Sequence, residues 1–195
     1  MPLELTWASN VAWVSMTASD DLNKLSWDRL HAWHRLWDEL ERASPQRVYV
    51  YSDRASIFAA GADIRELASF NEEQAAAYSA CGQRLMDRIE GYRGQVTALV
   101  SGSCYGGALD LVLACHRILA TRETLFCHPG VKLGIVTGFG GTVRLPEKVG
   151  ASAANWMFVS GKPLNATDAW RLGLVAHVFE THADMVDWAR AEPRN

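Results

Sequence analysis

The chain has 195 residues, of which 49% are hydrophobic and 21% are charged, and its formal net charge is −3. A folded domain of this length removes roughly 70% of its extended-chain surface from water, so one hydrophobic core can form without disulfides or structural metals. The slightly acidic charge argues against nucleic acid or an anionic membrane as the main partner. No apolar run approaches the roughly 20 residues that cross a bilayer, and the first residues do not resemble a secretion signal, so we expect a cytoplasmic protein.

Strand-like and helix-like segments alternate along the chain. Short β-branched and aromatic segments predict strands at residues 11–16, 47–52, 96–100 and 117–120. Ser26 has the position of an N-cap for a helix that reaches Ala43, and Asn71 with Gln74 resembles a capping box for a helix toward Glu90. Further helices are expected at residues 107–116, from residue 151, and at 165–172. This alternation indicates an α/β fold with much parallel strand pairing.

Two segments that contain small residues have features of a binding site. FAAGADIREL (58–67) follows a predicted strand, and its small residues let the backbone approach a ligand, although a simple strand-to-helix turn also needs small residues. SGSCYGGALD (101–110) opens a helix, whose free N–H groups suit an oxygen that becomes negative during a reaction. A third segment, residues 134–141, is either a flexible wall or a packed turn. None of the three has the glycine spacing of a dinucleotide or P-loop site.

One alternative is a cysteine hydrolase. Residues 102–106 match the pattern Gly-x-Cys-x-Gly between a strand and a helix, with Cys104 in the place of a nucleophile. Asp168 and then His177 or His182 follow in the order of an α/β-hydrolase triad. No HGGG-like oxyanion segment precedes them, and a small buried residue is the other interpretation of Cys104.

The remaining cysteines and histidines do not predict a metal site. Cys115-His116 and Cys127-His128 are adjacent pairs, and adjacent side chains on a strand or helix point apart. The four cysteines stand in apolar or glycine-rich surroundings without a secretion signal, so we expect reduced thiols rather than disulfides.

Taken together, the segments resemble the enoyl-CoA hydratase/isomerase (crotonase) superfamily. FAAGADIREL looks like the first oxyanion-hole segment of that family, and VSGSCYGGALDLVLACHRILAT looks like the second segment with its helix. FCHPGVKLGIVTGFGGTVRLPEKVG is similar to the next strand, active-site loop and Gly-Gly-Thr turn, and SGKPLNATDAWRLGLVAHVF is similar to the segment that leaves the core. The short segment LNKLS is also similar to a turn that the family places against coenzyme A. The resemblance covers about residues 10–180.

The resemblance implies a fold and a substrate class. It implies an α/β, crotonase-like (ClpP/crotonase) spiral of β-β-α units over residues 1–180, followed by a shortened C-terminal helical tail at residues 181–195. The expected substrate is an acyl-CoA thioester, with coenzyme A as part of the substrate and no separate cofactor. A homo-oligomer, trimer or hexamer, is also expected.

The resemblance also implies site residues. The backbone N–H groups of Ala62 and Gly107 would bind the thioester oxygen and stabilise an enolate. The substrate-binding residues would be Ala60, Ala62, Asp63, Ile64, Arg65 and Gly107, with Lys24 and Arg65 available to the anionic coenzyme.

Two departures from the family pattern bear on the reaction. Hydratases of this family use two glutamates, and here Asp110 stands at the first position and Gly130 at the second. A reacting group misplaced by about 1 Å can lose about 10²-fold in rate, which puts hydration in doubt. Asp110 is therefore expected to be the acid/base of an isomerisation or a decarboxylation, with His128 and Tyr105 as further acid/base candidates.

Two other interpretations remain open at this point. Asp110 could serve only to complement the helix dipole. The protein could also be a non-catalytic family member that binds acyl-CoA or an acyl carrier protein, an interpretation suggested by Gly130 and the short C-terminus.

Overall fold

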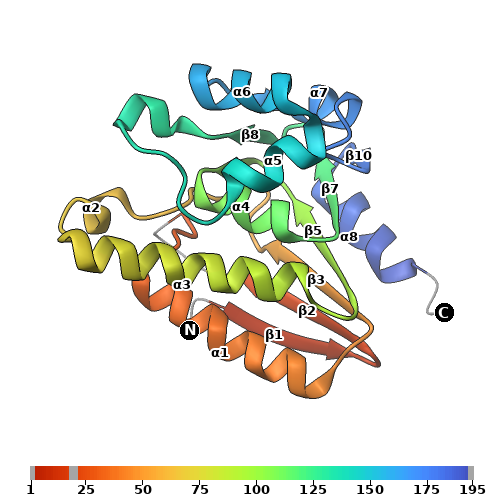
Figure 1. Ribbon diagram of the computed structural model, residues 1–195. Helices are drawn as coiled ribbons and strands as arrows, with labels where there is room; N and C mark the ends of the chain where they lie inside the picture. The colour runs from red at the N-terminus through yellow and green to blue at the C-terminus, as the bar shows by residue number, and fades with distance from the viewer. Residues whose placement is uncertain (1–2, 18–21, 193–195) are drawn as a thin grey trace.

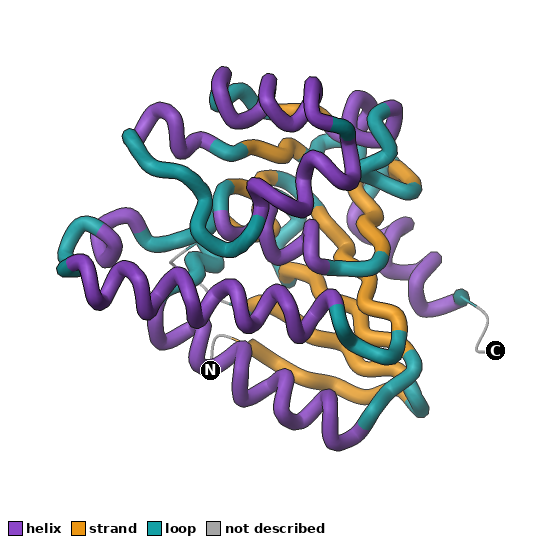
Figure 2. The backbone as a smooth tube through the Cα atoms, in the orientation of Figure 1, coloured by secondary structure: helices purple, strands orange, loops and turns teal. Residues whose placement is uncertain are grey.

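The computed structural model describes residues 3–17 and 22–192, and its strands form two sheets (Figures 1 and 2). The large sheet has the strand order β1-β2-β3-β5-β7-β10, and β1 is its antiparallel edge. Its strands are β1 (Leu3–Ala8), β2 (Val11–Met16), β3 (Arg47–Ser52), β5 (Gln95–Val100), β7 (Arg117–Thr121) and β10 (His177–Phe179). The small sheet consists of β4 (Ile57–Ala59), β6 (Ser103–Tyr105), β8 (Leu125–Cys127) and β9 (Leu164–Asn165), with β9 antiparallel to β8.

The helices follow the strands at regular places in the chain. They are α1 (Trp27–Ala43), α2 (Ile64–Leu67), α3 (Glu72–Glu90), α4 (Gly107–Ala114), the 3₁₀ helix η1 (Pro129–Leu133), α5 (Gly141–Val149), α6 (Ala151–Ser160), α7 (Ala166–Arg171) and α8 (His182–Ala191). Ser26 caps α1 as predicted, and Asn71 with Gln74 forms the predicted capping box of α3. Helix α5 was not predicted, because Pro146 interrupts its pattern and a glycine pair begins it.

A β-β-α repeat organises the core. Strands β3, β5 and β7 each enter the large sheet, and each is followed by a three-residue strand of the small sheet and then by helix. This repeat confirms the expected crotonase-like architecture. The sequence showed the first strand of each pair, but three residues are too few to display an alternating pattern.

Both faces of the large sheet are covered. Helices α1 and α3 lie side by side across one face, and α8 lies against the other (Figures 1 and 2). Helix α1 buries Trp33 and Trp37 completely on the first side, while α8 places Met185 and Val186 against Trp13 on the second. Strand β2 is consequently buried along its whole length.

Helix α8 occupies most of the C-terminal tail predicted at residues 181–195. The last three residues of that tail, 193–195, lie outside the described part of the chain. The proposed boundary at residue 180 stays a prediction. No helix among the described residues is long and apolar enough to cross a membrane.

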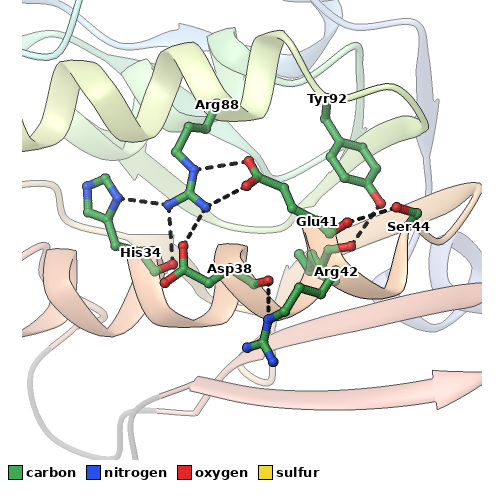
Figure 3. A network of polar contacts seen from close by, with 8 residues as sticks. His34, Asp38, Glu41, Arg42, Ser44, Arg88 and Tyr92 are labelled. Carbon is green, nitrogen blue, oxygen red and sulfur yellow. Dashed lines mark hydrogen bonds and ion pairs between the residues drawn. The ribbon is translucent and has the colours of Figure 1, made fainter.

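Polar contacts hold α1 against α3 (Figure 3). The guanidinium of Arg88 on α3 donates to groups of α1: the carboxylates of Asp38 at 2.7 Å and Glu41 at 2.8 Å, and Nδ1 of His34 at 3.2 Å. Tyr92, just beyond α3, donates to the carbonyl of Pro45 at 3.0 Å. These contacts join α1 to α3 on this face of the large sheet.

Candidate active site

Two backbone turns from different repeats meet beside Gly61. A Cβ on Gly61 would lie 2.5 Å from the carbonyl oxygen of Tyr105 and 3.0 Å from the amide nitrogen of Gly107. Gly61 has a φ of +87°, and Ala62 supplies the next amide. Among the described residues, neither the Ala62 nor the Gly107 amide donates a hydrogen bond. The structure therefore brings two free N–H groups, which were predicted to act together, to the same place.

Neighbouring segments hold these turns in position. The amide of Leu25 donates to the carbonyl of Gly61 at 2.7 Å, and the amide of Gly106 donates to the carbonyl of Cys127 at 2.8 Å. Each bond ties one turn to a segment distant in the sequence. The Gly107 amide is left at the N-terminus of α4, where the helix dipole is positive.

The side chain of Asn23 is a supporting residue that the sequence did not reveal. It is fully buried, and its amide donates to Oγ of Ser52 and to the carbonyl of Phe58, both at 3.0 Å. Arg29 in turn donates to Oδ1 of Asn23 at 3.3 Å. The contact with the Phe58 carbonyl fixes the strand that leads to Gly61, but a lone Asn in a turn carries no sequence signal of such a role.

Asp110 lies one turn into α4 and is fully buried (Figure 1 shows α4 between α3 and α5). Its Oδ2 accepts hydrogen bonds from the Thr137 hydroxyl and from the Phe139 amide, the latter at 3.2 Å. Burial raises the pKa of Asp110 to about 6, against the opposing effect of the Thr137 and Phe139 hydrogen bonds. A carboxyl with a pKa near neutrality can both accept and return a proton.

The loop of residues 134–140, which precedes α5, packs against Gly107 and Asp110. The Phe139 ring is buried and lies against Gly107, since a Cβ on that glycine would be 3.0 Å from it. Arg144 donates to the Phe139 carbonyl at 3.2 Å and is held by Asp87 and Glu90 of α3 at 2.6 Å and 2.8 Å. A cavity of about 400 Å³ lies elsewhere, on the α8 side of the large sheet, where Trp13, Tyr49 and Ala189 are among the residues that line it.

Gly130 cannot be exchanged for a carboxylate without rebuilding its turn. Its carbonyl accepts from the amide of Ile135 at 3.0 Å, and a Cβ at this position would lie 2.4 Å from the Ile135 carbonyl oxygen. The turn is built around a glycine, so Asp110 faces no second carboxylate from this position. The side chain that lies beside Asp110 is instead that of His128, whose Nε2 is 3.5 Å from Oδ1 of Asp110.

The model of the family described as enoyl-CoA hydratase/isomerase matches residues 6–192. The chain belongs to the enoyl-CoA hydratase/isomerase family. It is 35% identical over 155 residues to a probable enoyl-CoA hydratase of Bacillus subtilis, covering 79% of this chain and 60% of that protein. It is 40% identical over 139 residues to the fatty acid oxidation complex subunit alpha of Shewanella frigidimarina, covering 70% of this chain and 20% of that protein.

Solved structures of enoyl-CoA hydratases have the same fold. The Bacillus anthracis enzyme superposes with a TM-score of 0.91 at 26% identity, covering 97% of this chain and 74% of that one. The Thermoplasma volcanium enzyme superposes with a TM-score of 0.90 at 28% identity, covering 99% of this chain and 79% of that one. The crotonase-like fold expected from the sequence is confirmed. This family member spans about 60% of the length of its Bacillus subtilis relative.

The other predicted binding residues lie around the first turn. Nζ of Lys24 forms an ion pair with Oδ2 of Asp63 at 3.0 Å, and this contact lowers the pKa of Asp63. Ile64 and Arg65 are exposed in α2. Tyr105 is half-buried at the end of β6, and its hydroxyl makes no hydrogen bond to Asp110 among the described contacts.

The cysteine-hydrolase interpretation is wrong. Cys104 is fully buried, and burial raises the pKa of its thiol well above the ordinary value. His182 accepts from Ser101 or donates to it at 2.7 Å, and Asp168 pairs with Arg171 at 2.9 Å. His182 and Asp168 therefore have other partners and do not form a triad with Cys104. The order of residues in the sequence does not show which of them the fold brings together. The described residues also contain no group of side chains that could hold a metal ion.

Proposed function

We propose that this protein is an acyl-CoA thioester enzyme that stabilises an enolate and moves one proton with Asp110. The observation that carries this proposal is that two amides without a hydrogen-bond partner among the described residues, Ala62 after β4 and Gly107 at the N-terminus of α4, lie close together, and that α4 also carries the buried carboxyl of Asp110. Amides placed in this way donate to the thioester oxygen as it becomes negative. Loss of one such donor typically lowers a rate by about 10²–10³-fold.

A single carboxyl suits a transfer of one proton between carbons. Asp110 takes a proton from one carbon of a 3-enoyl thioester, the electron pair enters the enolate, and the proton returns to another carbon as the double bond moves. Decarboxylation uses the same parts, because loss of CO₂ leaves the enolate and Asp110 protonates it. Hydration needs a further group that activates water, and the position of the second family glutamate is Gly130. Isomerisation is therefore favoured over hydration.

The segment Ala60–Arg65 would line the path of the acyl-CoA. Its exposed end carries Arg65, and Lys24 lies beside it through the Asp63 ion pair. These cations suit the phosphates of coenzyme A, while the small residues Ala60 and Ala62 leave room for the thioester.

The test is a panel of thioesters offered to the purified protein: a 3-enoyl-CoA, crotonyl-CoA and a 2-carboxyacyl-CoA. We expect turnover of the 3-enoyl or the carboxyacyl substrate to exceed hydration of crotonyl-CoA. The Asp110→Asn variant should lose about 10²-fold or more in kcat while still binding the thioester. Unchanged activity in this variant would remove Asp110 from the mechanism.

A non-catalytic acyl-CoA or acyl-carrier-protein binder is the second candidate. The observation that favours it is Gly130, which stands at the position of the second family glutamate in a turn that has no room for a side chain. Calorimetric titration with a non-reacting thioester separates the two functions. Tight binding with no turnover of any thioester in the panel would select the binder.

A further inference from the structure

His128 is a buried polar side chain that lacks a hydrogen-bond partner among the described residues. It directly follows β8, is 3% exposed, and neither of its ring nitrogens is bonded. The ring of Phe158 lies beside it, with the two centroids 5.0 Å apart. An unpaired buried polar group destabilises a fold, so its presence here requires an explanation.

The adjacent unpaired atom is Oδ1 of Asp110, which lies 3.5 Å from Nε2 of His128. This separation is slightly longer than a hydrogen bond, and a small movement of the ring closes it. The other oxygen, Oδ2, already accepts from Thr137 and Phe139. The two oxygens of Asp110 therefore have different neighbours: Oδ2 accepts from the loop before α5, and Oδ1 lies between Gly141, the first residue of α5, and His128 after β8.

We propose that His128 is a positioning residue for Asp110, whose neutral ring donates Nε2–H to Oδ1 and leaves Oδ2 to exchange a proton with the substrate. This inference rests on the function proposed above. In the reaction a C–H bond of the thioester breaks, its electron pair enters the enolate, and the proton bonds to Oδ2. Transfer of that proton to a second carbon restores the carboxylate, so no oxidant, reductant or co-reactant is needed. For this step the Thr137 hydroxyl would rotate away from Oδ2, while the Phe139 amide keeps its hydrogen bond to that oxygen.

The protonation states agree with this arrangement. Burial lowers the pKa of His128 to about 4 and raises the pKa of Asp110 to about 6. At neutral pH the ring is neutral and the carboxyl is mostly ionised. An ionised carboxyl only accepts hydrogen bonds, and a neutral imidazole has one N–H, so the pair can bond only when Nε2 carries that hydrogen.

The surroundings supply few competing charges. Arg144 on α5 lowers the pKa of Asp110, and its guanidinium forms ion pairs with Asp87 and Glu90 of α3. Cys104 on β6 is a neutral buried thiol. The other groups that face Asp110 are neutral donors: the Thr137 hydroxyl and the amides of Phe139 and Gly141. His128 is thus the titratable partner of Asp110 in this part of the structure.

The direct test is ¹⁵N NMR of the histidine rings in the substrate-free protein between about pH 8 and pH 4. The His128→Gln variant identifies the His128 signals. We expect a neutral ring with hydrogen on Nε2 at neutral pH, and ring shifts that change with a midpoint near pH 6, where Asp110 titrates. The Asp110→Asn variant should lose that change. Hydrogen on Nδ1 instead, or ring shifts that ignore the Asp110 substitution, would overturn the proposal.

The kinetic test compares His128→Phe with His128→Gln. Phenylalanine keeps a ring against Phe158 but cannot donate, whereas the glutamine amide can. We expect His128→Phe to lower kcat by about 10-fold to 100-fold with little change in KM, and to move the acid limb of the pH–rate profile to higher pH. His128→Gln should retain most activity and the original limb, with thermal unfolding of both variants checking the fold.

A His128→Phe enzyme with the wild-type kcat and pH profile would overturn the positioning role. If the wild-type protein turns over no thioester, the proposed function fails, and the NMR titration still decides whether His128 and Asp110 are coupled.

Discussion

Gly61 shows how closely the two turns of the site approach each other. Its φ is +87°, in the left-handed region, and a Cβ would meet the carbonyl oxygen of Tyr105 at 2.5 Å. Small residues in this segment were expected from the sequence. The sequence did not show which atoms fill the space beside Gly61, because Tyr105 and Gly107 belong to a different repeat.

The Gly61→Ala variant should lower kcat by about 10²-fold, since it displaces one of the two amides. The strained φ should also reduce the free energy of unfolding by about 1–2 kcal/mol. Gly134→Ala is the matched control, because Gly134 has a φ of +69° but an added Cβ meets no atom within 4 Å. Steady-state kinetics and thermal unfolding of both variants make the comparison. Equal activity in the two variants would contradict the role assigned to the Ala62 and Gly107 amides.

Gly141 makes room for the carboxyl of Asp110. A Cβ on Gly141 would lie 2.0 Å from Oδ1. We expect Gly141→Ala to displace the carboxyl by about 1 Å and to reduce kcat by about 10²-fold. Thr142→Ala, at the exposed next position of α5, should keep wild-type kinetics. Kinetics of both variants test this prediction, which fails if Gly141→Ala is as active as Thr142→Ala.

At the scale of elements, the sequence showed the helix caps but not the short strands that form by pairing with distant segments. The caps of α1 and α3 are formed by residues three positions apart, so the sequence shows them directly. Strands β4, β6 and β8 are three residues long and exist through pairing with one another. Short strands that depend on non-local partners leave no periodic pattern to detect.

The contact of α1 with α3 gives a prediction about stability alone. Arg88 is 24% exposed and pairs with both Asp38 and Glu41 (Figure 3). Arg88→Met should lower the free energy of unfolding by about 1 kcal/mol, because exposed ion pairs contribute little singly and more in a network. Arg171→Met is the control, since Arg171 is 67% exposed and its ion pair with Asp168 lies within α7.

Urea unfolding measures both variants, and added salt should reduce the difference between Arg88→Met and the wild type. Enzyme activity should be unchanged in both. An Arg88→Met variant no less stable than Arg171→Met would mean that the network does not join the helices energetically.

At the scale of the molecule, the buried carboxyl of Asp110 opposes folding at neutral pH. Its pKa is raised from 3.8 to about 6 by burial, so the folded state binds a proton more tightly than the unfolded chain does. The folded protein is therefore favoured by this group at low pH, and the advantage is lost as pH rises from about 4 to about 6. Each pKa unit corresponds to about 1.4 kcal/mol, which makes the full effect about 3 kcal/mol.

Asp110→Asn should consequently be more stable than the wild type above pH 6, by up to about 3 kcal/mol. Asparagine resembles the protonated carboxyl and keeps an oxygen for Thr137 and Phe139. The gain should shrink toward zero as the pH falls to about 4. Urea unfolding across this pH range checks the prediction, and Asp187→Asn, an exposed change on α8, is the control. A gain that does not depend on pH would show that the pKa of Asp110 is the same in the folded and the unfolded protein.

The order of glycine-rich segments and the residues at the key positions were already present in the sequence. They were sufficient to indicate the family and to identify Asp110 and Gly130, because each motif consists of residues close together in the chain, and the β-β-α architecture was implied by the resemblance to that family. The partners of those residues were established only by folding: Gly61 against Tyr105, Phe139 against Gly107, and His128 against Asp110. Such contacts join segments from successive turns of the spiral, and nothing in the local chemistry of a histidine after a strand specifies the carboxyl it will face.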